Sequence, residues 1–146
     1  VYGPREDKEY WAECLALIRN LPNNVSVHYM GEIPHENVDK VLSQYDYFIF
    51  PTLGENYGHV IREAMMAGLP VIISNKTPWR DLENKSVGWD LPLEKSEAFV
   101  EIIDRCIQIN DAEYQKSSKK AKKYSIEMSN HPSSISANRN LFLRNN

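Results

Sequence analysis

The first part of the chain alternates between helix-like and strand-like patterns. Apolar residues recur every three or four positions across residues 7–20, which predicts an amphipathic helix. Residues 25–30 alternate in character and include two valines, so we expect a strand there. Val1 and Tyr2 resemble the end of an earlier strand. Pro34 is expected to begin a second helix, because proline is favoured in the first turn of a helix.

The second part of the chain contains the longest apolar runs. Residues 47–50 (Tyr-Phe-Ile-Phe) are typical of a strand that is buried on both faces of a parallel sheet. A helix is expected over 58–67, followed by Gly68 in the position of a helix-ending glycine. Residues 70–74 predict another buried strand. The remaining elements are expected to be a short strand at 87–91 and helices at 96–110, at 111–128 and from 133 to the C-terminus.

This alternation of strands and helices predicts an α/β fold with a Rossmann-like, doubly wound parallel sheet in a single domain. Sheets of this type bind ligands beyond the carboxyl ends of their strands. The loops that we expect to carry the function are therefore residues 3–6, 31–36, 51–57 and 74–79.

Composition narrows the class of protein only slightly. The 146 residues are 42% hydrophobic and 25% charged, as in ordinary globular domains. The net charge of −3 gives no general attraction to nucleic acid, and no apolar run approaches the roughly 20 residues of a membrane-spanning helix. Cys14 and Cys106 lie far apart on the apolar sides of expected helices, which indicates reduced core thiols in the cytoplasm. No His, Asp or Cys cluster has the spacing of metal ligands.

Residues 51–71 carry the strongest chemical signal. An expected strand runs into a loop with two glycines, Gly54 and Gly58, and a helix begins directly afterwards. The start of a helix offers unpaired N–H groups and the positive end of the helix dipole, which together favour an anion such as phosphate. Many α/β loops share this pattern, so it indicates a phosphate site only weakly when taken alone.

Two glutamates add to this signal. Glu55 precedes the expected helix, and Glu63 lies one turn after His59, where its side chain leans back toward the helix start. An ionised carboxylate accepts hydrogen bonds only, so Glu63 suits a ribose diol and Glu55 suits sugar hydroxyls. Either glutamate alone could equally be a solvated charge near a helix end.

Taken together, these residues resemble the signature of retaining glycosyltransferases with the GT-B fold, of the glycosyl transferases group 1 family. In that signature two glutamates are separated by seven residues, as are Glu55 and Glu63. The downstream pattern Glu-Ala-Met-x-x-Gly-x-Pro-Val matches residues 63–71. The resemblance covers nearly the whole chain. The sequence Thr-Pro-Trp-Arg at 77–80 further suggests bacterial enzymes of capsule or lipopolysaccharide synthesis.

The resemblance implies a role for each matching residue. Glu63 would hold the ribose hydroxyls of the nucleotide, and Glu55 would act as the catalytic residue at the donor sugar. Gly31 and Ile33 would flank the base. The backbone groups expected to receive the diphosphate and sugar belong to Asn56, Tyr57, Gly58, His59 and Val60. The family usually has a smaller or apolar residue where His59 stands, so this histidine either donates to a phosphate or is half-buried at the helix start.

The implied reaction is transfer of a glycosyl group, of the hexosyl type, from a nucleoside diphosphate sugar to a hydroxyl, with retention at the anomeric carbon. The resemblance implies no cofactor or metal and no nucleic acid partner. The acceptor would be a sugar or a lipid-linked glycan, and the enzyme would lie in the cytoplasm or at the inner face of the membrane. Lysines crowd one polar helix at 116, 119, 120, 122 and 123, as either a solvated face or a contact with anionic lipid.

The chain also departs from the family pattern. The family is bilobal, and its acceptor domain has no counterpart here. The donor domain normally opens with a strand and helix that carry an arginine and a lysine for the diphosphate, and we find no match for them. We therefore expect an N-terminally truncated donor domain that is inactive alone, and whose open sheet edges rearrange or associate between chains.

Three other readings stay open. A sugar-nucleotide epimerase or another GT-B relative is one, although the paired glutamates argue against it. A non-enzymatic α/β nucleotide-binding module, such as a receiver-like domain, is the second; it would need acidic residues at a strand end, where Pro51 and Thr52 stand instead. The third is an inactive fragment without a ligand.

Overall fold

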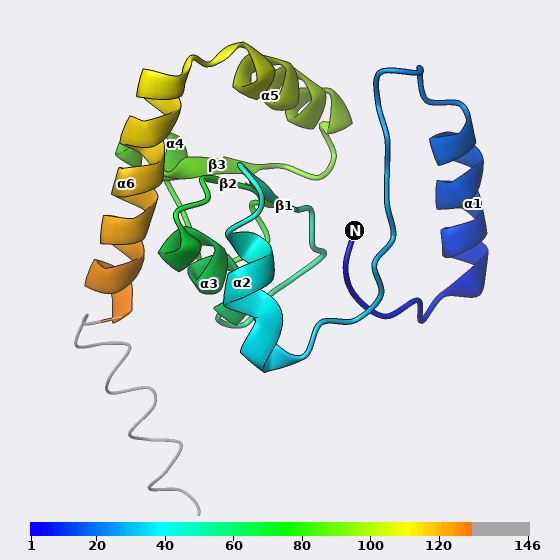
Figure 1. Cartoon of the computed structure of the whole chain (residues 1–146), viewed down its shortest axis with the longest axis horizontal. Helices are drawn as coiled ribbons and strands as arrows, with labels where there is room; N and C mark the ends of the chain where they lie inside the picture. The colour runs from blue at the N-terminus through cyan, green and yellow to red at the C-terminus, as the bar shows by residue number, and fades with distance from the viewer. Residues whose placement is uncertain (130–146) are drawn as a thin grey trace, which may run out of the picture. The chain divides into compact units, whose positions relative to one another are not determined.

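The computed structural model describes residues 1–129 of the chain, and the expected helix from residue 133 lies outside them. The chain forms two compact units, which divide between Val38 and Asp39 (Figure 1). The sheet and all the loops after its strands belong to the second unit.

The first unit contains one long helix, α1, over Lys8–Arg19. The helix begins where the sequence predicts, because the carboxylate of Asp7 accepts a hydrogen bond from the N–H of Tyr10 at 2.9 Å and caps the first turn. The rings of Trp11 and Tyr29 lie 5.0 Å apart and connect α1 to the extended segment that follows it. The predicted helix over 7–20 is thus confirmed.

The predicted strand over 25–30 is wrong. These residues form no strand: within residues 1–129 the segment and Gly31 after it have one parallel bridge, between Tyr2 and Gly31, and the Val1 amino group donates to His28 O at 2.6 Å. Val1 O accepts from Met30 N at 2.9 Å, and Gly31 O accepts from Gly3 N at 2.9 Å. With only these few residues beside it, the segment gains too few ladder hydrogen bonds to form a strand. Two of its apolar side chains, Val25 and Met30, are exposed.

The second unit is built on a three-stranded parallel sheet in the order β1-β2-β3. The strands are β1 (Phe48–Phe50), β2 (Val71–Ser74) and β3 (Gly88–Leu91), close to the positions that the sequence predicts. β2 is central and every one of its residues is buried, as expected for a strand covered on both faces.

Helices cover both faces of this sheet (Figure 1). α5 (Ser96–Gln108) packs on the face that carries Ile72 and Trp89, through Cys106 and its apolar neighbours. α3 (His59–Ala67) lies on the opposite face, with Ile61 and Met65 completely buried, and α6 (Asp111–Ser129) packs against α3. The α/β, Rossmann-like arrangement expected from the sequence is confirmed.

The short helices are less regular than the sequence suggests. The helix expected from Pro34 forms as one 3-10 turn, η1 (His35–Asn37), followed by α2 (Val38–Leu42). A further short helix, α4 (Leu82–Lys85), is not predicted from its sequence. It has too few residues to show a helical period, and both of its flanking residues have a left-handed backbone.

The prediction that residues 47–50 are buried on both faces is wrong for β1. Among the described residues, β1 pairs only with β2, and the Ile49 side chain is 48% exposed. Phe48 N donates to Pro70 O on the β2 side, so the N–H of Ile49 points toward the opposite, open edge. β1 is an edge strand in the described part of the chain.

Both cysteines are free thiols. Cys106 is buried in the core beneath α5, as predicted, whereas Cys14 on α1 is only partly buried. The expectation of two core thiols therefore holds for Cys106 alone.

Candidate functional site

The candidate site lies at the carboxyl ends of β1 and β2. The loop after β1 runs from Pro51 to Gly58 and leads into α3, and the loop after β2 begins at Asn75. Because parallel strands end at the same edge of a sheet, the two loops lie beside one another. All of the candidate residues between 55 and 63 belong to this region.

Gly58 shapes the start of α3. Its backbone is left-handed, with φ 75° and ψ 54°, and it forms the N-cap without any side-chain hydrogen bond. Its carbonyl accepts from Ile61 N at 3.0 Å and from Arg62 N at 3.1 Å, which closes the first turn. Within residues 1–129, the N–H groups of Gly58, His59 and Val60 donate no hydrogen bond. These groups are the donors that a helix start offers to an anion.

Three hydrogen bonds join the two loops. Ser74 Oγ donates to the carbonyl of Thr52 at 2.5 Å, directly beyond the ends of the strands. Glu55 N donates to the carbonyl of Lys76 at 3.4 Å. The indole Nε1 of Trp79 then donates to the carbonyl of Tyr57 at 2.8 Å. The pairing of β1 with β2 therefore continues through the loops as far as the start of α3.

The side chains predicted for the site differ in exposure. Glu55 and Glu63 are both partly buried, one at the loop and the other in the second turn of α3. Asn56 and His59 are exposed, so the half-buried position considered for His59 is wrong. The His59 ring lies 4.7 Å from the ring of Tyr57, which is partly buried. The functional roles predicted for these residues stay predictions.

Gly31 and Ile33 belong to the first unit, at its parallel bridge and in the segment after it. Gly31 has a left-handed backbone with φ 77°, which suits glycine at the turn after the extended segment. Their predicted contact with the base stays a prediction.

Lysine 76 brings positive charge to the carboxyl end of β2. Its Nζ lies 3.3 Å from the carboxylate of Glu94, and both side chains are well exposed. The pKa of Glu94 is lowered, first by a backbone hydrogen bond and then by Lys76. The ammonium group of Lys76 is thus held on the loop that also receives Glu55 N.

The sequence predicts that the loop at 74–79 lies near the site, but it does not predict the hydrogen bonds by which two side chains of this loop hold the site. Ser74 is completely buried and also accepts from Lys76 N at 3.3 Å, so it ties its own loop as well as the loop after β1. Trp79 is 4% exposed, like a core residue, and yet its indole donates to the loop after β1. Nothing in the spacing of apolar residues distinguishes such a tryptophan from an ordinary core residue.

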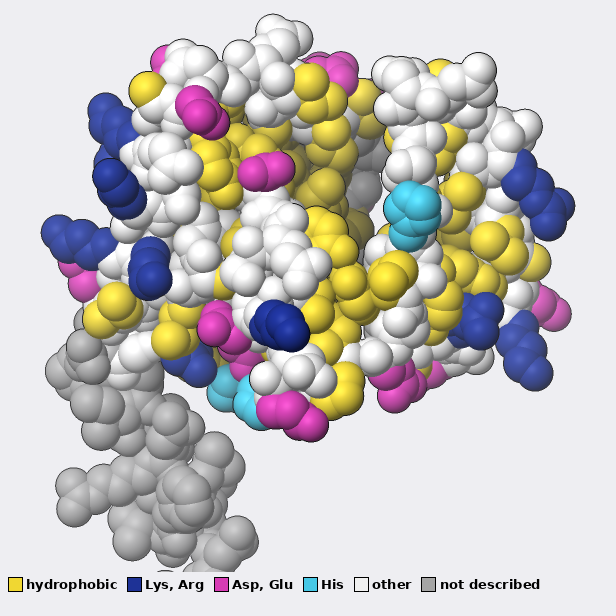
Figure 2. All heavy atoms as spheres, viewed as in Figure 1, with side chains coloured by type: hydrophobic (Ala, Val, Ile, Leu, Met, Phe, Trp, Pro, Cys, Tyr) yellow, Lys and Arg dark blue, Asp and Glu magenta, His cyan; other side chains and the backbone are white. Residues whose placement is uncertain are grey.

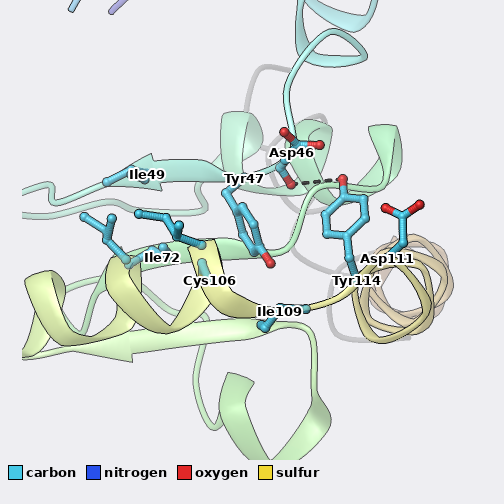
Figure 3. Close-up of a pocket in the computed structure, with 10 residues that line it drawn as sticks. Asp46, Tyr47, Ile49, Ile72, Cys106, Ile109, Asp111 and Tyr114 are labelled. Carbon is cyan, nitrogen blue, oxygen red and sulfur yellow. Dashed lines mark hydrogen bonds between the residues drawn. The ribbon is translucent and has the colours of Figure 1, made fainter. Parts of the chain in front are cut away.

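A cavity of about 390 Å³ lies elsewhere in the second unit (Figure 3). It is bordered by the residues before β1, the end of α5 and the start of α6, and contains none of the predicted site residues. Burial and the neighbouring Cys106 raise the pKa of Tyr47 above its ordinary value, and burial raises the pKa of Cys106. Tyr114 closes one side by donating from its hydroxyl to Asp46 O at 3.1 Å.

Comparison with known proteins decides the family. The model of the glycosyl transferases group 1 family matches residues 1–127. The chain belongs to this family. The match includes both units and the whole region from Glu55 to the end of the Glu-Ala-Met-x-x-Gly-x-Pro-Val pattern, so the predicted membership of the glycosyl transferases group 1 family is confirmed.

A relative of this group 1 glycosyltransferase chain is the O-antigen chain mannosyltransferase B of Escherichia coli. The two are 35% identical over 51 residues, which cover 35% of this chain and 13% of the relative. The chain thus spans a small part of the length of that enzyme. No solved structure shows a significant match.

Two further observations concern ligands and membranes. Across residues 1–129, no group of three or more His, Cys, Asp and Glu side chains is arranged to hold a metal ion. In the same part of the chain, none of the helices has the length and apolar character needed to cross a membrane.

Proposed function

We propose that this chain is the donor-binding part of a retaining glycosyltransferase with GT-B architecture. It would bind a nucleoside diphosphate sugar, whose glycosyl group passes to a hydroxyl of an acceptor held by another domain. The observation that carries this proposal is the start of α3, where three adjacent N–H groups have no hydrogen-bond partner within residues 1–129, in a segment whose two glutamates match the family signature.

The chemistry of the donor fits this position. Departure of the nucleoside diphosphate places negative charge on its phosphate oxygens, while the sugar becomes positive like an oxocarbenium ion. The N–H groups of Gly58, His59 and Val60 lie at the positive end of the α3 dipole, where such an anion is favoured. Donors fixed in advance stabilise developing charge without reorganisation, so no metal ion is required for this step.

The two glutamates complete the proposed site. Glu63 lies in the second turn of α3. Because side chains of a helix lean toward its N-terminus, the Glu63 carboxylate would reach the helix start and accept hydrogen bonds from the ribose hydroxyls. Glu55 lies at the loop whose backbone is held by Lys76 O, and it would contact the donor sugar near the reacting carbon. Asn56 and Tyr57 would contribute backbone groups between these two positions.

The wider role is proposed from the relative. The name of the E. coli enzyme refers to mannosyl transfer to O-antigen chains, so we infer a hexosyltransferase of bacterial polysaccharide or lipopolysaccharide synthesis. The acceptor would be a sugar or lipid-linked glycan. Such an enzyme would work in the cytoplasm, at or near the inner face of the membrane.

A contact with anionic lipid fits this setting. Basic side chains gather over α6 (Figure 2), where lysines at 116, 119, 120, 122 and 123 are exposed. Reversing the charge of Lys119, Lys122 and Lys123 together would remove binding to vesicles containing anionic phospholipid. Absence of vesicle binding by the unaltered chain at low salt would rule this contact out.

The donor site can be tested with a thermal-shift panel of UDP, GDP, ADP and dTDP and their common sugars. A ligand at about 100 times its dissociation constant adds roughly 2.7 kcal/mol, which raises Tm by several degrees. Glu63→Ala should lose the shift, whereas Glu101→Ala, which changes an exposed glutamate of α5, should keep it.

The alternatives predict other results. A shift that survives in Glu63→Ala would place the nucleotide elsewhere and contradict the site. Binding without any glycosyl transfer by a chain extended to include an acceptor domain would favour a non-enzymatic module. No shift with any nucleotide, in this chain or the extended one, would favour a fragment without a ligand.

A further inference from the structure

We propose that Trp79 is a positioning residue, which sets the direction of the Gly58 N–H through its hydrogen bond to the Tyr57 carbonyl. The inference rests on the proposed function, because the group that it positions is one of the proposed diphosphate donors. Trp79 itself is 4% exposed and does not need to touch the donor.

The geometry of the peptide bond links the two groups. Trp79 Nε1 donates to Tyr57 O at 2.8 Å, which holds this carbonyl toward the loop after β2. In a planar trans peptide the carbonyl of one residue and the N–H of the next point in opposite directions. Fixing the carbonyl of Tyr57 therefore turns the Gly58 N–H away from Trp79, and this N–H has no hydrogen-bond partner among residues 1–129.

Close packing at Gly58 holds the same turn from another side. A β-carbon on Gly58 would lie 3.0 Å from Nε1 of Trp79 and 2.8 Å from Cδ1 of Ile61. The indole therefore lies against the backbone of the glycine that caps α3. Since Gly58 offers no side-chain cap, the bond from Trp79 takes over part of the task of fixing this helix start.

Trp79 is itself held on several sides. Its N–H donates to the buried hydroxyl of Thr77 at 3.2 Å, which fixes the backbone of the loop after β2. Its ring makes edge contacts with Tyr57 at 6.5 Å and with Tyr124 of α6 at 6.0 Å. An indole confined in this way has one accessible orientation, so its N–H is a fixed donor rather than a mobile one.

The chain provides a matched control for this bond. Trp89 is also buried, at 8% exposure, and its Nε1 has no hydrogen-bond partner within residues 1–129. Replacing either tryptophan with phenylalanine removes the same atoms from the core, but only Trp79→Phe removes a hydrogen bond. Trp89→Phe therefore reports the cost of a smaller ring without the loss of an indole hydrogen bond, although it also alters the contact of the ring with Arg105 at 5.9 Å.

The experiment compares the full chain with Trp79→Phe and Trp89→Phe by two measurements. Hydrogen exchange at the amides of Ile61 and Arg62, which donate to the Gly58 carbonyl, reports how firmly the turn is held. Calorimetric titration with UDP, GDP, ADP and dTDP reports donor-site affinity. In Trp79→Phe we expect exchange at both amides to rise roughly two- to tenfold, and the Kd of the bound diphosphate to rise at least as much. Trp89→Phe should change neither quantity by this amount.

Equal behaviour of the two variants in both measurements would overturn the inference. If Trp79→Phe does not fold, Thr77→Val keeps the indole but removes the hydroxyl that accepts from the Trp79 backbone N–H, and should show the same two effects more weakly. Failure of the proposed function gives a different result: no diphosphate binds the unaltered chain. Faster exchange in Trp79→Phe alone would then still show that Trp79 fixes the turn, while its role in donor binding would be refuted.

Discussion

A β-carbon on Gly58 would lie 2.8 Å from Cδ1 of Ile61, a side chain that is completely buried. The backbone at Gly58 is also left-handed, with φ 75°. The start of α3 therefore requires glycine for two independent reasons, conformation and space.

Gly58→Ala should lower the free energy of unfolding by about 2 kcal/mol or more, because a left-handed alanine alone costs about 1–2 kcal/mol and the contact with Ile61 adds to it. Gly54→Ala is the matched control in the same loop, since a β-carbon there meets nothing within 4 Å and the backbone is not left-handed. It should stay within about 0.5 kcal/mol of the unaltered chain. Urea denaturation measures the free energy of unfolding of both variants. Equal values for Gly58→Ala and Gly54→Ala would contradict the requirement for glycine at the start of α3.

Ser74→Ala should destabilise the joined loops. The buried hydroxyl donates to Thr52 O and accepts from Lys76 N, so its removal leaves both backbone groups without this partner. A loss of about 1–3 kcal/mol is expected. Ser96→Ala, on the exposed first turn of α5, serves as control and should have little effect. A Ser74 variant as stable as that control would show that the loops do not depend on this bond.

The free energy of unfolding should fall at alkaline pH, because a thiol and a phenol that are buried beneath α5 resist losing their protons. Burial raises the pKa of Cys106 above its ordinary 9.0, and burial with the neighbouring thiol raises that of Tyr47 above 10.0. The unfolded chain therefore loses these protons first, and the stabilisation present below about pH 9 is lost as pH rises toward the folded-state pKa values. Urea midpoints between pH 8 and 11 should fall less steeply when Tyr47→Phe and Cys106→Ala are combined. An unchanged slope would mean that other groups cause the decline.

The open edge of β1 should promote self-association. Ile49 is 48% exposed there, and its N–H points away from β2. Ile49→Lys places a charge at this edge, which natural sheets use to prevent pairing between molecules. Analytical ultracentrifugation should show concentration-dependent association of the chain, reduced in the variant. A chain that stays monomeric at high concentration would refute the expectation drawn from the sequence.

The sequence predicts helices and strands best where the spacing of apolar residues matches the faces that are buried in the structure. β2 is apolar throughout and central in the sheet, and α5 shows one apolar face that packs on Ile72 and Trp89. Prediction fails where the neighbouring strands decide the outcome. Residues 25–30 have a strand pattern, but within the described part of the chain only Val1–Gly3 pairs beside them. β1 is likewise apolar. Its residue Ile49 is nevertheless exposed, because within the described residues β1 has a neighbouring strand on one side only.

The candidate site could also be predicted only in part. The glycine at the start of α3 and the position of Glu63 in its second turn follow from the motif and the helical period. The bonds from Ser74 and Trp79 do not, because they join loops that are about 22 residues apart in sequence. Only the parallel register of β1 and β2 brings these loops together.

The central claim is that the start of α3 receives the diphosphate of the donor. The most direct test is a titration of ¹⁵N-labelled chain with the nucleoside diphosphate that gives the largest thermal shift, followed by NMR. The account predicts that the largest shift changes fall on the amides of Gly58, His59 and Val60, with saturation at one site. Changes confined to other regions, such as the lysines of α6, or no saturable change at these three amides, would contradict it.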